Sequence, residues 1–135
     1  MRALLAALGM AASLPALGCG HCVEDKIASV YDHAVVTQAL AGKRHVAFFA
    51  IDGNFTPADG ARTARDAAQS AYGVVQGSVR VSEQTASLSV AFNPQHVSFA
   101  TLEKQLRRKL TPKGISLLAL RVMERPVELK TVSRK

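Results

Sequence analysis

Residues 78–92, SVRVSEQTASLSVAF, decide the fold of this chain. Apolar and polar residues alternate through both halves of the stretch, which is the pattern of half-buried strands. The apolar positions that share one side are Val79 and Val81 in the first half and Leu88, Val90 and Phe92 in the second. A polar turn at 83–85 separates the halves. The stretch therefore predicts two antiparallel strands with one side facing a core.

A helix is predicted on each side of this strand pair. Before it, Thr56 is the expected N-cap of a helix that has Pro57 in its first turn and ends at Gly73. After it, Ser98 caps a second helix that Pro112 ends. The inner face of this second helix is formed by Phe99, Leu102, Leu106 and Leu110. Their spacing of three and four residues predicts a helix with one buried side.

An apolar strand is predicted outside each helix, at 45–51 and at 115–123. The order from residue 45 onward is then β-α-β-β-α-β, the split βαβ arrangement of ferredoxin-like folds. Because each helix connects two strands as a crossover, both helices are expected on one face of a four-stranded sheet. We predict an α+β fold of this ferredoxin-like class.

An additional amphipathic helix is predicted at residues 23–40, ahead of the first strand. The open face of the sheet is polar under the second and third predicted strands, where it carries Ser78, Arg80, Ser82, Ser87 and Ser89. The strands 45–51 and 115–123 are apolar on both sides, so half of that face needs a cover. We expect the helix at 23–40 to pack on this apolar half.

Length, composition and charge exclude several classes of protein. The chain has 135 residues, of which 48% are hydrophobic, so one folded domain with a short appendage is expected. Two cysteines are too few for a disulfide-stapled miniprotein or a four-cysteine metal site. The net charge is +7, but no aromatic residues interleave the basic ones to stack on bases. The sequence predicts no nucleic-acid partner.

Residues 1–18 have the pattern of a secretory signal peptide. Arg2 is followed by an apolar run to Leu17, and Ala16-Leu17-Gly18 is a small-x-small cleavage site. The expected destination is an exported, oxidising space such as a bacterial periplasm. Cleavage after Gly18 would make Cys19 the first residue, so lipidation of Cys19 is an alternative. Membrane contact is expected only with a lipidated Cys19 or an uncleaved leader.

The predicted organisation of the chain has four parts. They are a signal peptide at 1–18, a Cys-Gly-His-Cys motif with the amphipathic helix at 19–42, the ferredoxin-like domain at 43–124 and a basic tail at 125–135.

The domain at about 45–124 resembles a heavy-metal-associated domain. The stretches that carry the resemblance are Gly73-Val74-Val75, Ser78-Val79-Arg80-Val81, residues 88–94 and Val97-Ser98. The resemblance implies a ferredoxin-like fold that carries a soft metal on a Met-x-Cys-x-x-Cys loop after the first strand. The corresponding loop here, residues 52–57, contains no cysteine. The family's ligands therefore have no counterpart in this loop.

The candidate site is the motif Cys19-Gly20-His21-Cys22. A step of three residues lets both sulfurs face one point, either to bind a thiophilic ion or to close a disulfide. Two thiolates favour linear coordination, which suits copper(I) and also mercury(II), whereas zinc would need further ligands such as His21. We predict a soft-metal-binding protein of the metallochaperone kind, with Cys19, Cys22 and His21 as ligands and a metal donor or acceptor protein as partner.

Two other functions remain open at this point. Cys-Gly-His-Cys is also the motif of protein disulfide isomerases, so the chain could be a thiol–disulfide oxidoreductase. It could instead be a lipid-anchored or structural interaction module. The sequence offers no nucleophile–base pair and no phosphate-binding loop, which disfavours a hydrolase or transferase. His33, His45 and His96 are interpreted as surface or packing residues, and Met123 as a core residue.

Overall fold

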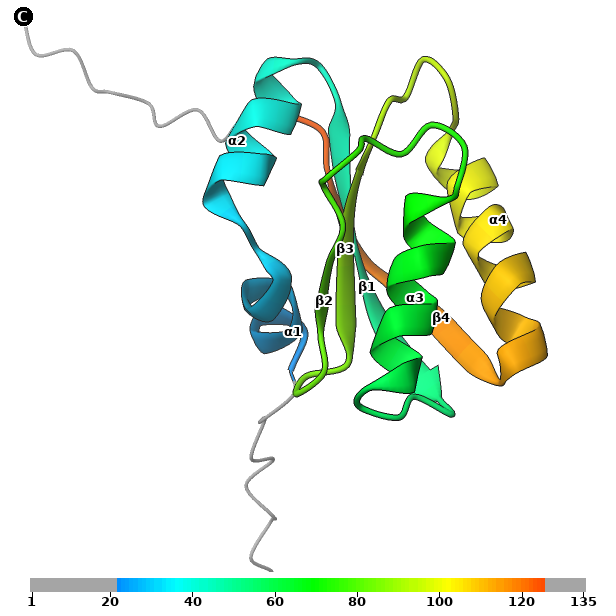
Figure 1. Cartoon of the computed structure of the whole chain (residues 1–135). Helices are drawn as coiled ribbons and strands as arrows, with labels where there is room; N and C mark the ends of the chain where they lie inside the picture. Colours follow the sequence, from blue (N-terminus) through cyan, green and yellow to red (C-terminus); the bar gives the residue numbers. More distant parts are fainter. Residues whose placement is uncertain (1–21, 126–135) are drawn as a thin grey trace, which may run out of the picture.

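A computed structural model of the chain describes residues 22–125, and the elements lie in two helical layers around one sheet (Figure 1). The helices are α1 (Val23–Val30), α2 (His33–Ala41), α3 (Asp59–Gln69), α4 (Phe99–Leu110) and the short 3-10 helix η1 (Thr111–Lys113). The strands are β1 (His45–Gly53), β2 (Arg80–Ser82), β3 (Ser87–Phe92) and β4 (Ile115–Met123).

The sheet has the order β2-β3-β1-β4, and every pair in it is antiparallel. From β1 onward, the chain follows β-α-β-β-α-β, so the predicted α+β, ferredoxin-like fold class is confirmed. Helices α3 and α4, here called the crossover layer, cover one face of the sheet (Figure 1). Helices α1 and α2, here called the N-terminal layer, lie on the other face.

The main core lies between the sheet and the crossover layer. Alternate residues of β1 (Ala47 and Phe49) and of β3 (Leu88, Val90 and Phe92) point into it. The helices contribute Ala64, Ala67, Ala68, Leu102, Leu106 and Leu110. Phe49, Phe92 and the three leucines are fully buried. The apolar residues that alternate along the strands and those that repeat every three or four positions along the helices thus pack together in one cluster.

Strand β2 is shorter than the sequence predicts. The alternation begins at Ser78, yet the ladder with β3 starts at Arg80. Gly77 has a φ of 77°, which turns the chain just before this point. The Ser78 hydroxyl accepts a hydrogen bond from the backbone N of Ala91 at 3.1 Å and donates one to the backbone O of Val75 at 2.6 Å. The buried Ser78 hydroxyl therefore takes the place of a backbone carbonyl as the hydrogen-bond partner of the Ala91 N–H.

The predicted helix at 23–40 is two helices. The chain leaves helical geometry at Tyr31 (ψ 108°) and Asp32 (ψ 110°), and α2 begins at His33. The Asp32 carboxylate accepts a hydrogen bond from the backbone N of Val35 at 3.2 Å and so caps α2. An Asp favours an N-cap over a helix interior, which explains the break.

The N-terminal layer packs on β1, as predicted, but its other main contact is with the serine-bearing β3, where the sequence predicts β4. Helix α1 packs mainly on β3, and Ser87 and Ser89 of that strand are 0% and 1% exposed. Because serine is small, a helix can approach the sheet closely there. The second core cluster joins Val46 and Phe48 of β1 and Ala91 of β3 to the helix residues Ile27, Val30, Val36, Ala39 and Leu40.

Strand β4 keeps an exposed side. Its Leu118 is 63% exposed, although the sequence predicts a cover over this part of the sheet. The register between β1 and β4 also shifts, since Phe49 pairs with Ala119 but Phe48 pairs with Arg121. Leu120 is the extra residue of this bulge. Of the two doubly apolar strands, only β1 is covered on both faces.

Candidate functional site

Cys22 is the one residue of the Cys-Gly-His-Cys motif that the structure describes. It is the N-cap of α1, in extended geometry with φ −69° and ψ 166°, and its backbone O accepts from the backbone N of Lys26 at 3.0 Å. The side chain does not cap the helix, and the half-buried sulfur is a free thiol within the described part of the chain. Since Cys19 is the other cysteine of the chain, no residue within 22–125 can form a disulfide with Cys22.

Several other predicted features of the chain lie outside the described residues. They are the ligands Cys19 and His21, the signal peptide at 1–18 and the basic tail after residue 125.

Helix α1 is fixed to the sheet, and Cys22 with it. Ile27 and Val30 are buried against the sheet. The Lys26 ammonium donates to the backbone O of Thr85 at 2.5 Å, and Arg121 of β4 donates to Glu24 at 2.6 Å. The Glu24–Arg121 pair is largely exposed, so it adds little stability to the attachment of the helix.

The first turn of α1 lies at the end of the sheet where β1 finishes. Lys26 contacts the turn between β2 and β3, and the backbone N of Ile51 donates to Ala86 of the same turn at 2.8 Å. The loop at 52–57 follows directly. Cys22 and the loop at 52–57 therefore share one end of the sheet.

The loop at 52–57 is occupied by its own polar contacts. The Asp52 carboxylate accepts from the backbone N of Gly53 at 2.7 Å, and the backbone N of Asn54 donates to Gly114 at 2.9 Å. Gly53 has a φ of 88°, and a Cβ on it would lie 2.2 Å from the Gly114 oxygen. The loop has a fixed structural role between β1 and β4.

Helix α3 begins later than the sequence predicts. Its N-cap is Ala58, and the helix starts at Asp59. The Thr56 hydroxyl accepts from the backbone N of Gly60 at 3.2 Å, so Thr56 stabilises the turn that leads into the helix.

The histidines and Met123 are distributed over the surface and the packing layers. His33 opens α2 beside Tyr31, His45 lies edge-on to Phe92, and His96 stacks on Tyr72. Met123 packs against the second core cluster, as predicted. Within residues 22–125, no group of three or more His, Cys, Asp or Glu side chains could hold a metal ion.

One carboxyl group has a clearly shifted pKa. The backbone hydrogen bond from Val35 and the Arg80 guanidinium, 3.1 Å from the Asp32 carboxylate, hold the pKa of Asp32 below its ordinary value. Both Asp32 and Arg80 are more than one-third exposed, so their ion pair is screened by water. The ionised Asp32 thus joins the start of α2 to the edge strand β2.

The two helical layers differ in charge. The residues of α3, α4 and η1 include seven basic and three acidic side chains. The basic ones are Arg62, Arg65, Lys104, Arg107, Arg108, Lys109 and Lys113. Helices α1 and α2 carry one lysine against Glu24 and Asp25, with Asp32 between them. The crossover layer is therefore the basic face of the molecule.

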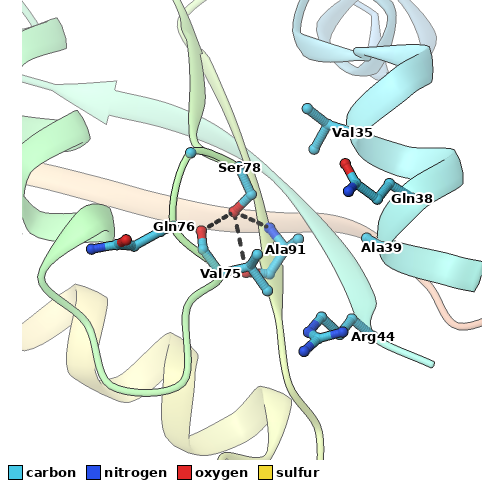
Figure 2. A pocket seen from close by; sticks show the side chains of 9 residues that line it. Val35, Gln38, Ala39, Arg44, Val75, Gln76, Ser78 and Ala91 are labelled. Atoms are coloured by element: carbon cyan, nitrogen blue, oxygen red, sulfur yellow. Dashed lines mark hydrogen bonds between the residues drawn. The ribbon is translucent and has the colours of Figure 1, made fainter. Parts of the chain in front are cut away.

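A groove that the sequence does not reveal lies between α2 and the segment before β2 (Figure 2). It encloses about 320 Å³, with Val35 and Ala39 on the α2 side and Val75 and Ala91 opposite. Arg44 and Gln38 lie along its opening. Beside the groove, the segment before β2 stays close to β3, since the backbone N of Val75 donates to the backbone O of Ala91 at 2.9 Å.

No helix among the described residues combines the length and apolar character needed to cross a bilayer.

Comparisons with known proteins give structural similarity only. No protein-family model matches the chain, and no curated protein matches its sequence. A crystal structure of oxidised MerP from Ralstonia metallidurans CH34 is 18% identical, with a TM-score of 0.46 over 56% of this chain and 96% of that one. A copper-binding domain from HMA7, a P-type ATPase, is 17% identical, with a TM-score of 0.48 over 58% and 96%. The fold class rests on strand order and pairing, and copper binding is a property of the second protein's domain.

Proposed function

We propose that this is an exported protein that binds a soft metal ion, copper(I) in the first place, between the thiolates of Cys19 and Cys22. His21 is the further ligand available to an ion that needs more than two donors, such as zinc. The observation that supports the proposal is the place of Cys22 at the N-terminus of an anchored helix, three residues after a second cysteine.

The donor set determines the class of metal. Thiolates are soft ligands and select copper(I), mercury(II) or zinc over hard cations such as magnesium or calcium. Two sulfurs three residues apart can bind an ion in linear geometry without a third ligand. An ion held at the chain terminus is also accessible to a thiol pair on another molecule. The proposed activity is therefore metal exchange with a donor or acceptor protein.

The position of Cys22 suits such an exchange. The buried Ile27 and Val30 and the contacts of Lys26 and Glu24 fix the helix, so the sulfur has a defined place at one end of the sheet. The loop at 52–57 at that same end has no cysteine and makes its own contacts. We infer that the thiol pair before α1 performs the task that the loop cysteines perform in heavy-metal-associated domains.

Metal titration tests the proposal. The reduced protein, purified without its leader, is expected to bind about one copper(I) with an ultraviolet thiolate-to-metal charge-transfer band. Cys22→Ser should abolish the band. His33→Ala is the matched control, because His33 is exposed on the next helix and lies outside the proposed ligand set. Retained tight binding by the Cys19→Ser/Cys22→Ser variant would contradict the proposal.

An insulin-reduction assay addresses the alternative redox function of the same motif. Turnover of insulin disulfides well above that of free glutathione, together with weak copper(I) binding, would favour a thiol–disulfide oxidoreductase. The intact mass of the protein from soluble and membrane fractions tests export. A chain that begins at an unmodified Cys19 supports the proposal, and a lipid mass on Cys19 would favour the anchored module.

A further inference from the structure

We propose that two copies of this chain pair along β4 to form a symmetric dimer with a continuous sheet. The proposal goes beyond metal binding and does not depend on it. It starts from the two edges of the sheet, which differ in length and in exposure.

Strand β2 is a protected edge. It has three residues, and the chain before it turns away at Gly77. Its Arg80 is engaged by Asp32 of the N-terminal layer at 3.1 Å. Short edge strands with charged side chains resist pairing with other chains.

Strand β4 is a long edge with nine residues. No strand among the described residues pairs with its outer side. Its Leu118 is 63% exposed on the face that the N-terminal layer leaves uncovered. An edge with an exposed apolar side chain is the feature that usually marks strand pairing between molecules.

The register identifies the backbone groups that are free. The backbone N of Asn54 donates to Gly114, and hydrogen-bonded pairs alternate along an antiparallel ladder. Ser116 and Leu118 therefore direct their N–H and C=O groups toward β1. On its other side, β1 pairs with β3, and there the backbone N of Ile51 donates to Ala86. Because neighbouring residues of a strand point their backbone groups in opposite directions, Ala50 and Asp52 direct theirs toward β4, which supports the same assignment.

Ile115, Leu117 and Ala119 consequently direct their N–H and C=O groups outward. Gly114, with a φ of 75°, precedes this segment, and the bulge at Leu120 follows it. The pairing segment is thus five residues long, with one outward-facing residue at its centre and one at each end.

This arrangement is self-complementary under a two-fold axis at Leu117. Leu117 then pairs with the partner subunit's Leu117, and Ile115 pairs with the partner subunit's Ala119, each pair exchanging both hydrogen bonds. All the outward groups of the segment are used in this register. If one strand shifts by two residues relative to its partner, some of these outward groups have no partner. If it shifts by one residue, outward-facing residues stand opposite inward-facing ones and the hydrogen bonds cannot form.

The exposed Leu118 gains a contact in the same register. It lies opposite the partner subunit's Ser116 and diagonal to the partner subunit's Leu118, within reach of a long side chain.

The dimer also brings two basic crossover layers into one assembly, so added salt should strengthen it by screening their repulsion. A five-residue pairing buries little area, so we expect a reversible dimer with a dissociation constant above about 1 µM.

Sedimentation of the leaderless Cys19→Ser/Cys22→Ser protein tests the dimer without interference from thiols or metal. Between about 10 µM and about 1 mM, the mass should rise toward twice that of the monomer. Leu118→Lys should raise the dissociation constant at least about tenfold, since two charges would meet beside the axis. Tyr72→Lys is the matched control, because Tyr72 is 64% exposed but follows α3, on the other face of the sheet from Leu118, and it should leave association unchanged.

Cross-linking tests the register. In the same background, Ser116→Cys/Leu118→Cys should form a disulfide-linked dimer on mild oxidation, since those positions oppose each other across the axis. A monomer throughout the concentration range would overturn the proposal. A dimer that Leu118→Lys leaves intact, that Tyr72→Lys also abolishes or that salt dissociates would overturn it as well.

Discussion

The two helical layers pack on the same sheet but are held by different means. The cluster under the crossover layer contains 17 buried apolar residues, and the cluster under the N-terminal layer contains 8. Burial of apolar area is the dominant favourable term in folding, so the crossover face supplies most of the stability. The N-terminal face combines its smaller cluster with polar ties such as Lys26 to Thr85 and Asp32 to Arg80.

This difference indicates how stability is divided between scaffold and site. The crossover layer and the sheet form the scaffold, whereas the free thiol belongs to the layer with fewer apolar contacts. Regions with small buried clusters open locally at a lower free energy than the global core does. We expect α1 and α2 to exchange amide hydrogens faster than β1 and β3.

Leu106→Ala is expected to have the largest effect. Leu106 is fully buried at the centre of α4, and truncation of such a residue costs about 2–5 kcal/mol through lost burial and the cavity left behind. Denaturant unfolding should show one transition at lower midpoint, with both layers lost together. A variant that loses only α4 would show that the crossover layer is not the scaffold.

Ile27→Ala tests the other side of the comparison. Ile27 is buried under α1, and its truncation is expected to cost about 2 kcal/mol, at the low end for buried aliphatic residues. Hydrogen exchange should locate the loss in α1, with protection of β1 and β3 retained. An equal loss of protection in both layers would mean that the domain opens as a single unit.

Ser78→Ala tests a buried polar contact within the sheet, between the segment before β2 and Ala91 of β3. Removal of the hydroxyl leaves the backbone N of Ala91 without its partner, which costs about 1–2 kcal/mol for a buried donor. Thermal unfolding measures the change. The exposed Ser29→Ala is the control, and it should lie within about 0.5 kcal/mol of the parent.

Asp32→Asn is expected to change the stability least, and the size of its effect depends on pH. Because the pKa of Asp32 is lowered in the folded protein, its carboxylate stabilises the fold above the ordinary carboxyl pKa. That contribution is lost as the pH falls through the lower folded pKa. Asp32→Asn keeps a good N-cap but cannot ionise, so its stability should fall less than the parent's below about pH 4. Urea titrations at several pH values measure the difference, and parallel curves would contradict it.

Much of the fold could be predicted because its signals are local. The alternation at 87–92, the leucine spacing of α4 and the Ser98 cap all act within a few residues, and each gave the right element. The strand order then followed from the split βαβ pattern.

The errors arose where tertiary contacts decide. Asp32 is an ordinary polar residue in a helical pattern, and only its bond to Val35 and its pairing with Arg80 fix the break between α1 and α2. The choice of the serine half as the docking surface depends on how closely a helix can approach small side chains. Leu118 was expected under that helix and lies bare instead.

The residues of the candidate site could be predicted from the sequence, but their place on the sheet could not. The chain has two cysteines, and their spacing indicates a thiol-based function. The end of the sheet at which Cys22 lies follows from the contacts of Lys26, which no local pattern contains. The groove beside α2 was missed for the same reason, since residues of α2, of β3 and of the segment before β2 line it together.

The order of the layers along the chain has a consequence for biogenesis. Helix α1 is made first, but the surface that receives it belongs largely to β3, and the contact from Lys26 to Thr85 spans 59 positions. Such non-local contacts form late, after the loops between them have closed. The segment that carries Cys22 therefore reaches its place on the sheet only after β3 has formed, so the first helix of the domain to be made is among the last to be packed.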